Sequence, residues 1–396
     1  MTEIYLNQAG VICSLGSNIA EVEQRLFHGD PSLLTVTDRY SPGRALPLGM
    51  VTAELAPVTL AAEDSRNNRL LAAAVTPLLP TIERLKTRFG RDRIGIVIGT
   101  STSGIAEGEA ALDVSGDRPL LAADYRYTTQ EFSAPSRFLS RWLDLGGPCF
   151  ILSSACTSGG KALAAAARLL KLGVCDAVLA GGVDSLCGMT LGGFSALTVT
   201  AATPCNPFSA NRCGTNIGEG AAVFVMTREP GDSETASVRL AGWGETSDAH
   251  HISSPEPEGR GAAAAMRQAL AMARLQPEHI DYLNLHGTAT VHNDLMEARA
   301  VRQVLDHAVP CSSTKPLTGH TLAAAGAVEA LLCWLLLQRD DGLLPPHHWD
   351  GAVDSELPEL TGLARARLDH PPQTVMSNSF AFGGNNLSLI LTRGRS

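Results

Sequence analysis

The sequence has few aromatic residues, no run of basic residues and no apolar segment long enough to cross a membrane. Aromatic residues make up 5% of the 396 residues, and the formal net charge is -9. An acidic chain without a lysine- or arginine-rich run lacks the phosphate-tracking surface that nucleic-acid-binding proteins use. The longest apolar run, Ala330 to Leu337, is far shorter than the roughly 20 residues that a membrane helix needs. We therefore expect neither nucleic-acid binding nor a membrane span.

The spacing of cysteine and histidine argues against two further classes of protein. The nine cysteines are odd in number, and the sequence contains no CxxC or HxxxH pair of the kind that holds zinc. The N-terminal segment has neither the basic start and apolar core of a signal peptide nor the composition of a transit peptide. We therefore expect a cytoplasmic protein whose thiols are mostly free and buried.

Small residues are abundant, and they lie in alternating strand and helix patterns. The 38 glycines and a hydrophobic fraction of 44% indicate a large α/β core. In the first half, a strand, an alanine-rich helix and another strand follow in the order of a parallel crossover. The second half has similar patterns. The predicted strands are residues 93–99, 149–155, 176–180, 282–285, 309–312, 375–377 and 387–391, and the predicted helices are residues 157–173 and 322–338.

The two halves of the chain look like a weak internal duplication. In each half, a strand that ends in small polar residues leads into an alanine-rich helix, as in SSACTSGGKALAAAARLL and CSSTKPLTGHTLAAAGAVEALL. Two unrelated α/β units would look similar, so duplication is a hypothesis. We place the change of half near Pro230 to Ser247 and expect two domains, residues 1–240 and 241–396.

Cys156 differs from the other cysteines because it lies where a predicted buried strand meets the following helix. A thiol at a helix N-terminus feels the positive end of the helix dipole, which lowers its pKa and favours the nucleophilic thiolate. Gly159 and Gly160 would leave room for a substrate carbonyl. The alternative is an inert core cysteine at the start of a buried helix, and this local context leaves both interpretations open.

Two histidines, a lysine and a glutamate stand out because their surroundings are apolar. His286 directly follows the apolar strand in LNLHGTAT, and Lys315, His320 and Glu329 are almost the only ionisable groups in STKPLTGHTLAAAGAVEALLCW. Burying an unpaired charge is costly, so these groups should pair, bind an ion or take part in chemistry. The alternatives are a core histidine at 286, a surface lysine and a capping histidine. The neighbouring His292 is expected to be exposed and is assigned no role.

A fourth motif, SNSFAFGGNN, places two glycines after two aromatic residues. Gly383 and Gly384 permit backbone conformations in which main-chain N–H groups point into a site. Taken alone, this motif predicts only a turn.

In their order along the chain, ACTSGG, HGTAT, STKPLTGH and NSFAFGGNN resemble the motifs of the β-ketoacyl-acyl-carrier-protein synthases. The resemblance extends to GTSTSGI at 99–105 and NPFSANRCGTNIGEGAA at 206–222, so it covers nearly the whole chain. It implies an α/β protein with the thiolase fold, in which two similar αβαβα halves form a five-layered core. Two histidines with one cysteine resemble the elongating Cys-His-His branch rather than the initiating Cys-His-Asn branch. A thiolase would carry a second catalytic cysteine near the C-terminal glycines, and none is there.

The resemblance implies an acyltransferase, a 3-oxoacyl-carrier-protein synthase that carries out a decarboxylative Claisen condensation. Cys156 would hold the acyl group, and its backbone N–H would bind the oxyanion together with that of Phe382. His286 and His320 would polarise the malonyl thioester. Lys315 and Glu329 would form a supporting charged network.

The resemblance also implies binding residues around this centre. Thr288 and Thr290 would bind the pantetheine arm, and Ile105 would form a wall of the acyl pocket. No organic cofactor is expected. A monovalent cation would be surrounded by Asn284, Glu329, Ser377 and Asn378.

The expected partners are acyl carrier proteins, which present acyl and malonyl groups on phosphopantetheine. The chain would form a homodimer, or a heterodimer with a homologue similar to a chain-length factor. Arg137, Arg141 and Arg212 are candidates for a basic surface that docks the acidic carrier. The pathway would be fatty-acid biosynthesis or a specialised polyene pathway, because NSFAFGGNN and LPPHHWDG resemble segments of synthases for aryl polyenes.

Two other functions stay open beside condensation. A non-catalytic subunit similar to a chain-length factor has the same fold but typically lacks the nucleophilic cysteine. A cysteine hydrolase needs a general base that activates water, and it would not explain two histidines and a buried lysine.

Three positions depart from the usual pattern of the family. Ala289 stands where Gly or Ser is usual, and Ala381 and Asn385 stand where Gly and Thr are usual. Because alanine tolerates positive φ less well than glycine, Ala381 predicts a stiffer gate at Phe382.

Overall fold

A ten-stranded mixed sheet organises the chain in the computed structural model, which describes residues 2–29, 31–113, 119–231, 236–305 and 308–394. The strand order is β12-β11-β13-β14-β10-β1-β9-β8-β4-β7. The strands of the first half are β1 (Tyr5–Cys13), β4 (Ile94–Gly99), β7 (Cys149–Leu152), β8 (Ala177–Asp184) and β9 (Gly220–Thr227). Those of the second half are β10 (Val238–Ser247), β11 (Tyr282–Asn284), β12 (Cys311–Ser312), β13 (Thr374–Ala381) and β14 (Asn385–Arg393).

Each half of the sheet has the same internal arrangement. In the first half, β4 runs parallel to its neighbours β7 and β8, and β9 runs antiparallel to β8 and β1. In the second half, β11 runs parallel to β12 and β13, and β14 runs antiparallel to β13 and β10. The halves meet where β1 pairs with β10. Since side chains at the carboxyl ends of neighbouring parallel strands meet at one edge, each half brings the ends of three strands together.

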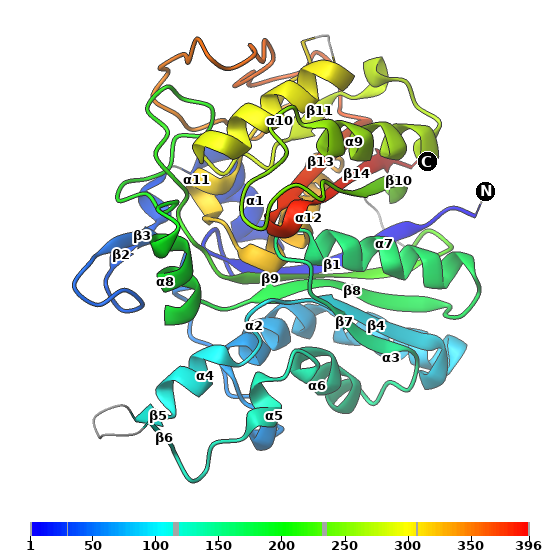
Figure 1. Ribbon diagram of the computed structural model, residues 1–396. Helices are drawn as coiled ribbons and strands as arrows, with labels where there is room; N and C mark the ends of the chain where they lie inside the picture. Colours follow the sequence, from blue (N-terminus) through cyan, green and yellow to red (C-terminus); the bar gives the residue numbers. More distant parts are fainter. Residues whose placement is uncertain (1, 30, 114–118, 232–235, 306–307, 395–396) are drawn as a thin grey trace.

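The helices form three layers around the two halves of the sheet, and together they give the five layers that the resemblance implied (Figure 1). One outer layer packs on the first half and the other on the second half, while the central layer lies between them. The first outer layer contains α2 (Arg66–Val75), α3 (Leu79–Phe89) and α6 (Ala134–Leu143), the central layer α7 (Ser158–Lys171) and α12 (Ala325–Leu336), and the second outer layer α9 (Arg260–Ala273) and α10 (Val291–Val304).

Shorter helices and strands lie outside this arrangement of layers. They are α1 (Ile19–His28), β2 (Thr35–Thr37), β3 (Leu46–Leu48), α4 (Ile105–Ala110), β5 (Leu112–Asp113), β6 (Leu120–Leu121), α5 (Tyr127–Gln130), α8 (Gly188–Ala196) and α11 (Lys315–Thr318). The predicted strands and helices are present with shifted ends, whereas β1, β9 and β10 had no prediction.

The apolar helix α12 is buried in protein along its whole length of 12 residues. A helix that is apolar on every face needs cover on every face, and here α7, β13, β8 and β9 supply it. Among the described residues, no helix is long and apolar enough to span a bilayer.

Small residues set the distance between the two central helices. A Cβ built on Gly159 of α7 would lie 2.8 Å from the carbonyl oxygen of Ala323 and 2.9 Å from the Cβ of Ala327. On the other side, a Cβ on Gly326 would lie 2.9 Å from the backbone nitrogen of Gly160. These contacts are shorter than a carbon atom tolerates, so glycine is required where the backbones of α7 and α12 approach.

Gly159→Ala should therefore push α7 away from α12 and destabilise the protein by about 1–3 kcal/mol, the usual cost of overpacking. Gly192→Ala is the matched control, because nothing lies within 4 Å of its added Cβ and α8 contains the position. The control should leave the unfolding midpoint in urea unchanged or raise it slightly, since alanine favours helix. Equal midpoints for the wild type and Gly159→Ala would contradict the packing argument.

Candidate active site

A tight turn between β7 and α7 presents Cys156. Ala155, just before it, has φ of 50°, a left-handed conformation that costs energy for a residue with a side chain. The turn is closed by side chains, since Ser154 N donates to Ser158 Oγ at 2.8 Å and Thr157 Oγ1 donates to Ser154 O at 2.7 Å. The thiol of Cys156 is buried, with 6% of the residue exposed, at the bottom of a cavity.

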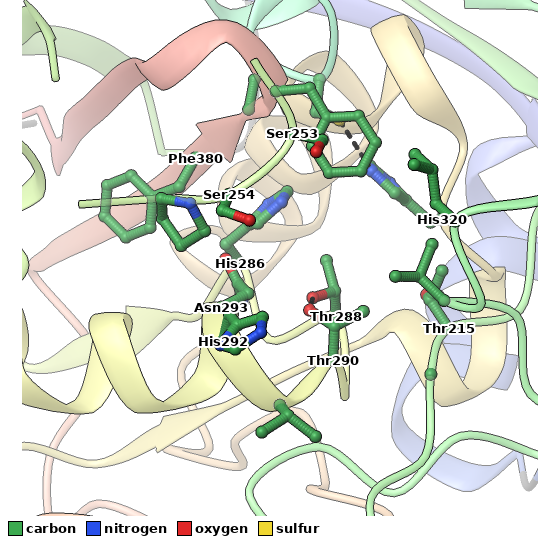
Figure 2. A pocket seen from close by; sticks show the side chains of 18 of the residues that line it. Thr215, Ser253, Ser254, His286, Thr288, Thr290, His292, Asn293, His320 and Phe380 are labelled. Atoms are coloured by element: carbon green, nitrogen blue, oxygen red, sulfur yellow. Dashed lines mark hydrogen bonds between the residues drawn. The ribbon is translucent and has the colours of Figure 1, made fainter. Parts of the chain in front are cut away.

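The structure brings Cys156, His286 and His320 together from three separate segments. One ligand atom of each lies within 4.8 Å of the others. His320 Nε2 lies 2.9 Å from Cys156 Sγ, and the two imidazole rings stand nearly perpendicular, with centroids 5.3 Å apart. Figure 2 shows His286 and His320 on the wall of one cavity. The three residues can therefore act on one substrate group.

Lys315 and Glu329 form a buried ion pair beside His286. Lys315 Nζ lies 2.5 Å from Glu329 Oε1, and the side chains are 0% and 3% exposed. The ammonium group also donates to the carbonyl oxygen of His286 and lies 3.5 Å from its Nδ1. An ammonium facing Nδ1 favours the tautomer that carries its proton on Nε2, the nitrogen free to face the cavity.

Both imidazoles are neutral in this environment. Burial, followed by the charge of Lys315, lowers the pKa of His286 and the pKa of His320 well below the ordinary value. Burial also raises the pKa of the Glu329 carboxyl, although Lys315 opposes this shift. The net result is a buried site in which hydrogen bonds, not an imidazolium charge, would stabilise a developing oxyanion.

The expectation of a low pKa at Cys156 is wrong. Burial raises the pKa of the Cys156 thiol to about 12, and the opposing charge of Lys315 only partly offsets it. The thiol is therefore neutral at rest, and its proton must leave as the sulfur attacks. His320 Nε2 is the nearby group that can take it.

Two carboxylates to which sequence reasoning gave no role hold the loop after His286. Glu297 accepts hydrogen bonds from the backbone nitrogens of His286 and Gly287, both at 2.8 Å. Asp294 accepts from the nitrogen of Ala289 at 3.2 Å. Burial raises the pKa of Glu297 to about 7 and that of Asp294 to about 6. Their spacing of three residues on α10, which puts both on one helix face, was the available signal.

A third such carboxylate, Asp184, links the two halves of the site. It is fully buried and accepts hydrogen bonds from Thr100, Ser101 and Thr102 in the loop after β4. It also accepts from the backbone nitrogen of Ala323 at 2.7 Å, three residues after His320. Asp184 thus ties the loop GTSTSG to the segment that carries His320.

The cavity above the three residues has a volume of about 270 Å³. Thr288 and Thr290 line it, and their hydroxyl oxygens lie 2.9 Å apart. Phe382 also lines it and stacks on Phe194, with ring centroids 5.4 Å apart. Ile105, at the start of α4, is not among its lining residues, so its place in an acyl pocket stays a prediction.

The strain expected at Ala381 is absent. Its φ is -122°, which any residue adopts, and the left-handed residues after Phe382 are Gly383 and Gly384, with φ of 76° and 71°. Ala289 does have a left-handed backbone, with φ of 62°. The argument for a stiffer gate at Ala381 therefore fails, because the positive φ lies at the glycines that follow.

Of the three arginines expected on a docking surface, Arg212 is excluded. It is buried, donates to Ser209 O at 2.9 Å and forms an ion pair with Asp354. Arg137 and Arg141 both pair with the buried Glu63, with side chains 25% and 61% exposed. The prediction for Arg212 is wrong because an internal carboxylate uses its charge.

The fold and the site define a class of protein: a five-layered enzyme with a buried Cys-His-His centre. Sequence models of the Beta-ketoacyl synthase N-terminal and C-terminal domains match residues 61–230 and 238–348. The chain belongs to the β-ketoacyl synthase family.

Individual relatives agree with this assignment. The chain is 39% identical to nodulation protein E of Rhizobium leguminosarum bv. trifolii over 65% of this chain and 64% of that protein, just under two thirds of its length. It is 29% identical to 3-oxoacyl-[acyl-carrier-protein] synthase 2 of Coxiella burnetii over 98% of each chain. A solved structure shows the ketosynthase ApeO in complex with its chain length factor ApeC, from Xenorhabdus doucetiae. One chain of that complex superposes on this one with a TM-score of 0.91 and 42% sequence identity. The match covers 99% of this chain and 98% of that chain.

Alkylation of Cys156 by iodoacetamide should accelerate about tenfold for each pH unit between about pH 7 and about pH 9, without levelling off. A pKa raised above this window makes the thiolate fraction grow in proportion to hydroxide throughout it. Peptide mass spectrometry measures the rate at each pH, and the exposed Cys213 reports reagent activity in the same samples. A rate that reaches a plateau within the window would show that the thiolate is already formed.

Proposed function

We propose that this β-ketoacyl synthase joins an acyl group held on Cys156 to a malonyl group in a decarboxylative Claisen condensation. The observation that carries the proposal is the contact of Cys156 Sγ with His320 Nε2, with His286 across the same cavity and Lys315 behind it. A nucleophile and two neutral imidazoles, all buried, suit the formation and attack of an enolate.

Acyl transfer comes first. The thiol proton of Cys156 moves to His320 Nε2 as the sulfur attacks the acyl thioester of a carrier. The oxyanion is held by the backbone N–H groups of Cys156 and Phe382, and the carrier sulfur then leaves and takes the proton. The acyl group remains on Cys156 as a thioester.

Condensation follows when malonyl carrier occupies the cavity. With the sulfur acylated, His320 no longer shares a proton with it, and its imidazole faces the malonyl thioester together with His286. As carbon dioxide leaves, the electrons of the broken carbon–carbon bond form an enolate, whose oxygen accepts a hydrogen bond from His286 Nε2. The enolate carbon attacks the acyl carbonyl, the bond to Cys156 breaks, and the thiolate takes one proton from solvent.

The resemblance also supports substrates carried on phosphopantetheine of acyl carrier proteins, with Thr288 and Thr290 along the arm. The pathway we propose is fatty-acid or polyketide-like biosynthesis, with specialised polyene lipids favoured only by the segments NSFAFGGNN and LPPHHWDG. A non-catalytic subunit is not favoured, because the chain keeps the cysteine and both histidines. A cytoplasmic location is part of the proposal.

A monovalent cation fits beside the ion pair. Asn284 Oδ1, Glu329 Oε2 and Ser377 Oγ are buried and make no hydrogen bond of normal geometry. Asn378 fits less well, because its Oδ1 accepts from Ser388 at 2.7 Å. Oxygen donors of this kind suit a hard cation, which would fix the orientation of Glu329 and add positive charge near the site.

We propose that residues 1–240 and 241–396 form two related halves. The repeated strand order supports this division, and the change of half would fall close to the start of β10 at Val238.

The strand β7 is the surface at which we propose a second copy, or a homologue similar to a chain-length factor, associates. It lies at the edge of the ten-stranded sheet, and its first residues Cys149 and Phe150 are exposed. An exposed apolar edge strand readily pairs with another chain, and burial in a dimer satisfies its free backbone groups.

Phe150→Asp should weaken association about tenfold or more, because a carboxylate would be buried at the strand-strand contact. Sedimentation velocity at several concentrations measures the oligomer. Leu172→Asp is the matched control, since Leu172 is 76% exposed at the end of α7 and is not part of β7. An unchanged sedimentation profile for Phe150→Asp would rule out this edge as the interface.

Incubation with acyl and malonyl carrier proteins tests the reaction itself. The wild type should form an acyl adduct on Cys156 and release a β-ketoacyl carrier product lengthened by two carbons, both measured by mass spectrometry. Cys156→Ser should lose the thioester adduct. His286→Ala should keep the adduct yet condense about 100-fold more slowly or worse, because it lacks the donor to the enolate.

His320→Ala should slow both adduct formation and condensation, since this histidine takes the thiol proton. Free fatty acid as the only product would indicate a hydrolase. Absence of any adduct on Cys156 from wild-type protein would indicate a non-catalytic subunit.

A further inference from the structure

One wall of the cavity is a continuous segment that runs from its floor to its mouth. His286 is 1% exposed, Thr288 is 6% exposed, Thr290 is half-buried, and Val291 and His292 are exposed. All five line the cavity. Figure 2 shows His292 on the same wall as His286, with Thr288 and Thr290 beside it. Depth in the cavity therefore decreases steadily along this stretch of chain.

The mouth has few groups that could bind an anion. Of the described residues that line the cavity, none is lysine or arginine, and Asp248 is the one carboxylate. His286 and His320 lie at the floor, so among the described residues that line the cavity His292 carries the basic side chain at the mouth. An imidazole has an N–H donor in either protonation state. Ser253, Ser254 and Asn293 are further polar residues on the lining.

A substrate arm bound along this wall has a defined direction. Its thioester must reach Cys156 and His286 at the floor, and its amides then lie at the depth of Thr288 and Thr290. The opposite end of a phosphopantetheine arm is its phosphate, which is left at the mouth. This end of the arm needs hydrogen-bond donors, because a phosphate near a cleft is bound by N–H and O–H groups.

We propose that His292 binds the phosphate of the phosphopantetheine arm and so sets the register of the malonyl thioester over Cys156. This inference rests on the proposed condensation and deepens it. His292 is then a binding residue for the arm itself and not part of the surface that docks the carrier protein.

The experiment compares two malonyl thioesters that differ only in the phosphate, malonyl-phosphopantetheine and malonyl-pantetheine, on enzyme already acylated at Cys156. The wild type should show kcat/KM about three- to fivefold higher for the phosphorylated thioester, the size of one exposed charge-assisted contact. His292→Ala should abolish that preference and leave malonyl-pantetheine unchanged. His292→Lys should restore the preference, because it returns a cationic donor to the mouth.

Val291→Ala is the matched control, since Val291 is the neighbouring exposed lining residue without a polar group, and it should keep the preference. An equal loss for both thioesters in His292→Ala would overturn the proposal, because it would mean that His292 supports the fold or the wall. A loss seen only with the intact carrier protein would place His292 on the carrier surface and also overturn it. If the wild type condenses neither thioester nor malonyl carrier protein, the proposed condensation falls, and this inference falls with it.

Discussion

A lysine and a glutamate buried together against an imidazole determine the electrostatics of this site. Lys315 and Glu329 are out of contact with water, and removing one partner of such a pair costs about 3–5 kcal/mol because the other charge is stranded. Burial lowers the pKa of both histidines, and the same ammonium lowers it further and contacts His286 at two atoms. The neutral state of the imidazoles follows from burial together with this ammonium, and the tautomer of His286 follows from the position of Lys315 at its Nδ1.

The central helix layer is what makes that placement possible. Helix α12 carries Glu329 and has no face toward water. The carboxyl group of Glu329 must therefore point at a partner inside the protein. Helix α7 starts at the turn of Cys156, and the glycine contacts between α7 and α12 allow the two helices to approach. The nucleophile and Glu329 are thereby held at two helices from different halves of the chain, while Lys315 comes from the short helix α11. A change in helix spacing would alter the distance from Cys156 to His320.

The sequence predicted what lies within single segments and missed what joins distant ones. Cys156, His286, Lys315, His320 and Glu329 stand out because polar residues interrupt apolar runs, and the structure gathers them. Asp184 and Glu297 were missed because their partners include backbone N–H groups of other segments. The spacing of residues can place Glu297 on a helix face, but it does not show which segment that face contacts. The pKa of Cys156 was misjudged for a related reason, since the helix start is local whereas burial depends on the whole fold. Arg212 was expected at the surface because its partner Asp354 lies 142 positions away along the chain.

The position of one proton separates condensation from hydrolysis at this centre. To hydrolyse an acyl-Cys156, an imidazole would have to accept a proton from water, and His286 is poorly suited because Lys315 faces its Nδ1 and its Nε2 carries the hydrogen. That same Nε2–H is the group an enolate oxygen needs. His320 can accept a proton, but it lies 2.9 Å from the sulfur, where the acyl chain on Cys156 and the arm of the second substrate would exclude water. The buried lysine therefore does more than stabilise a charge, because it fixes the tautomer of His286. In that tautomer, His286 donates a hydrogen bond to the oxygen of an enolate and is a poor base toward water.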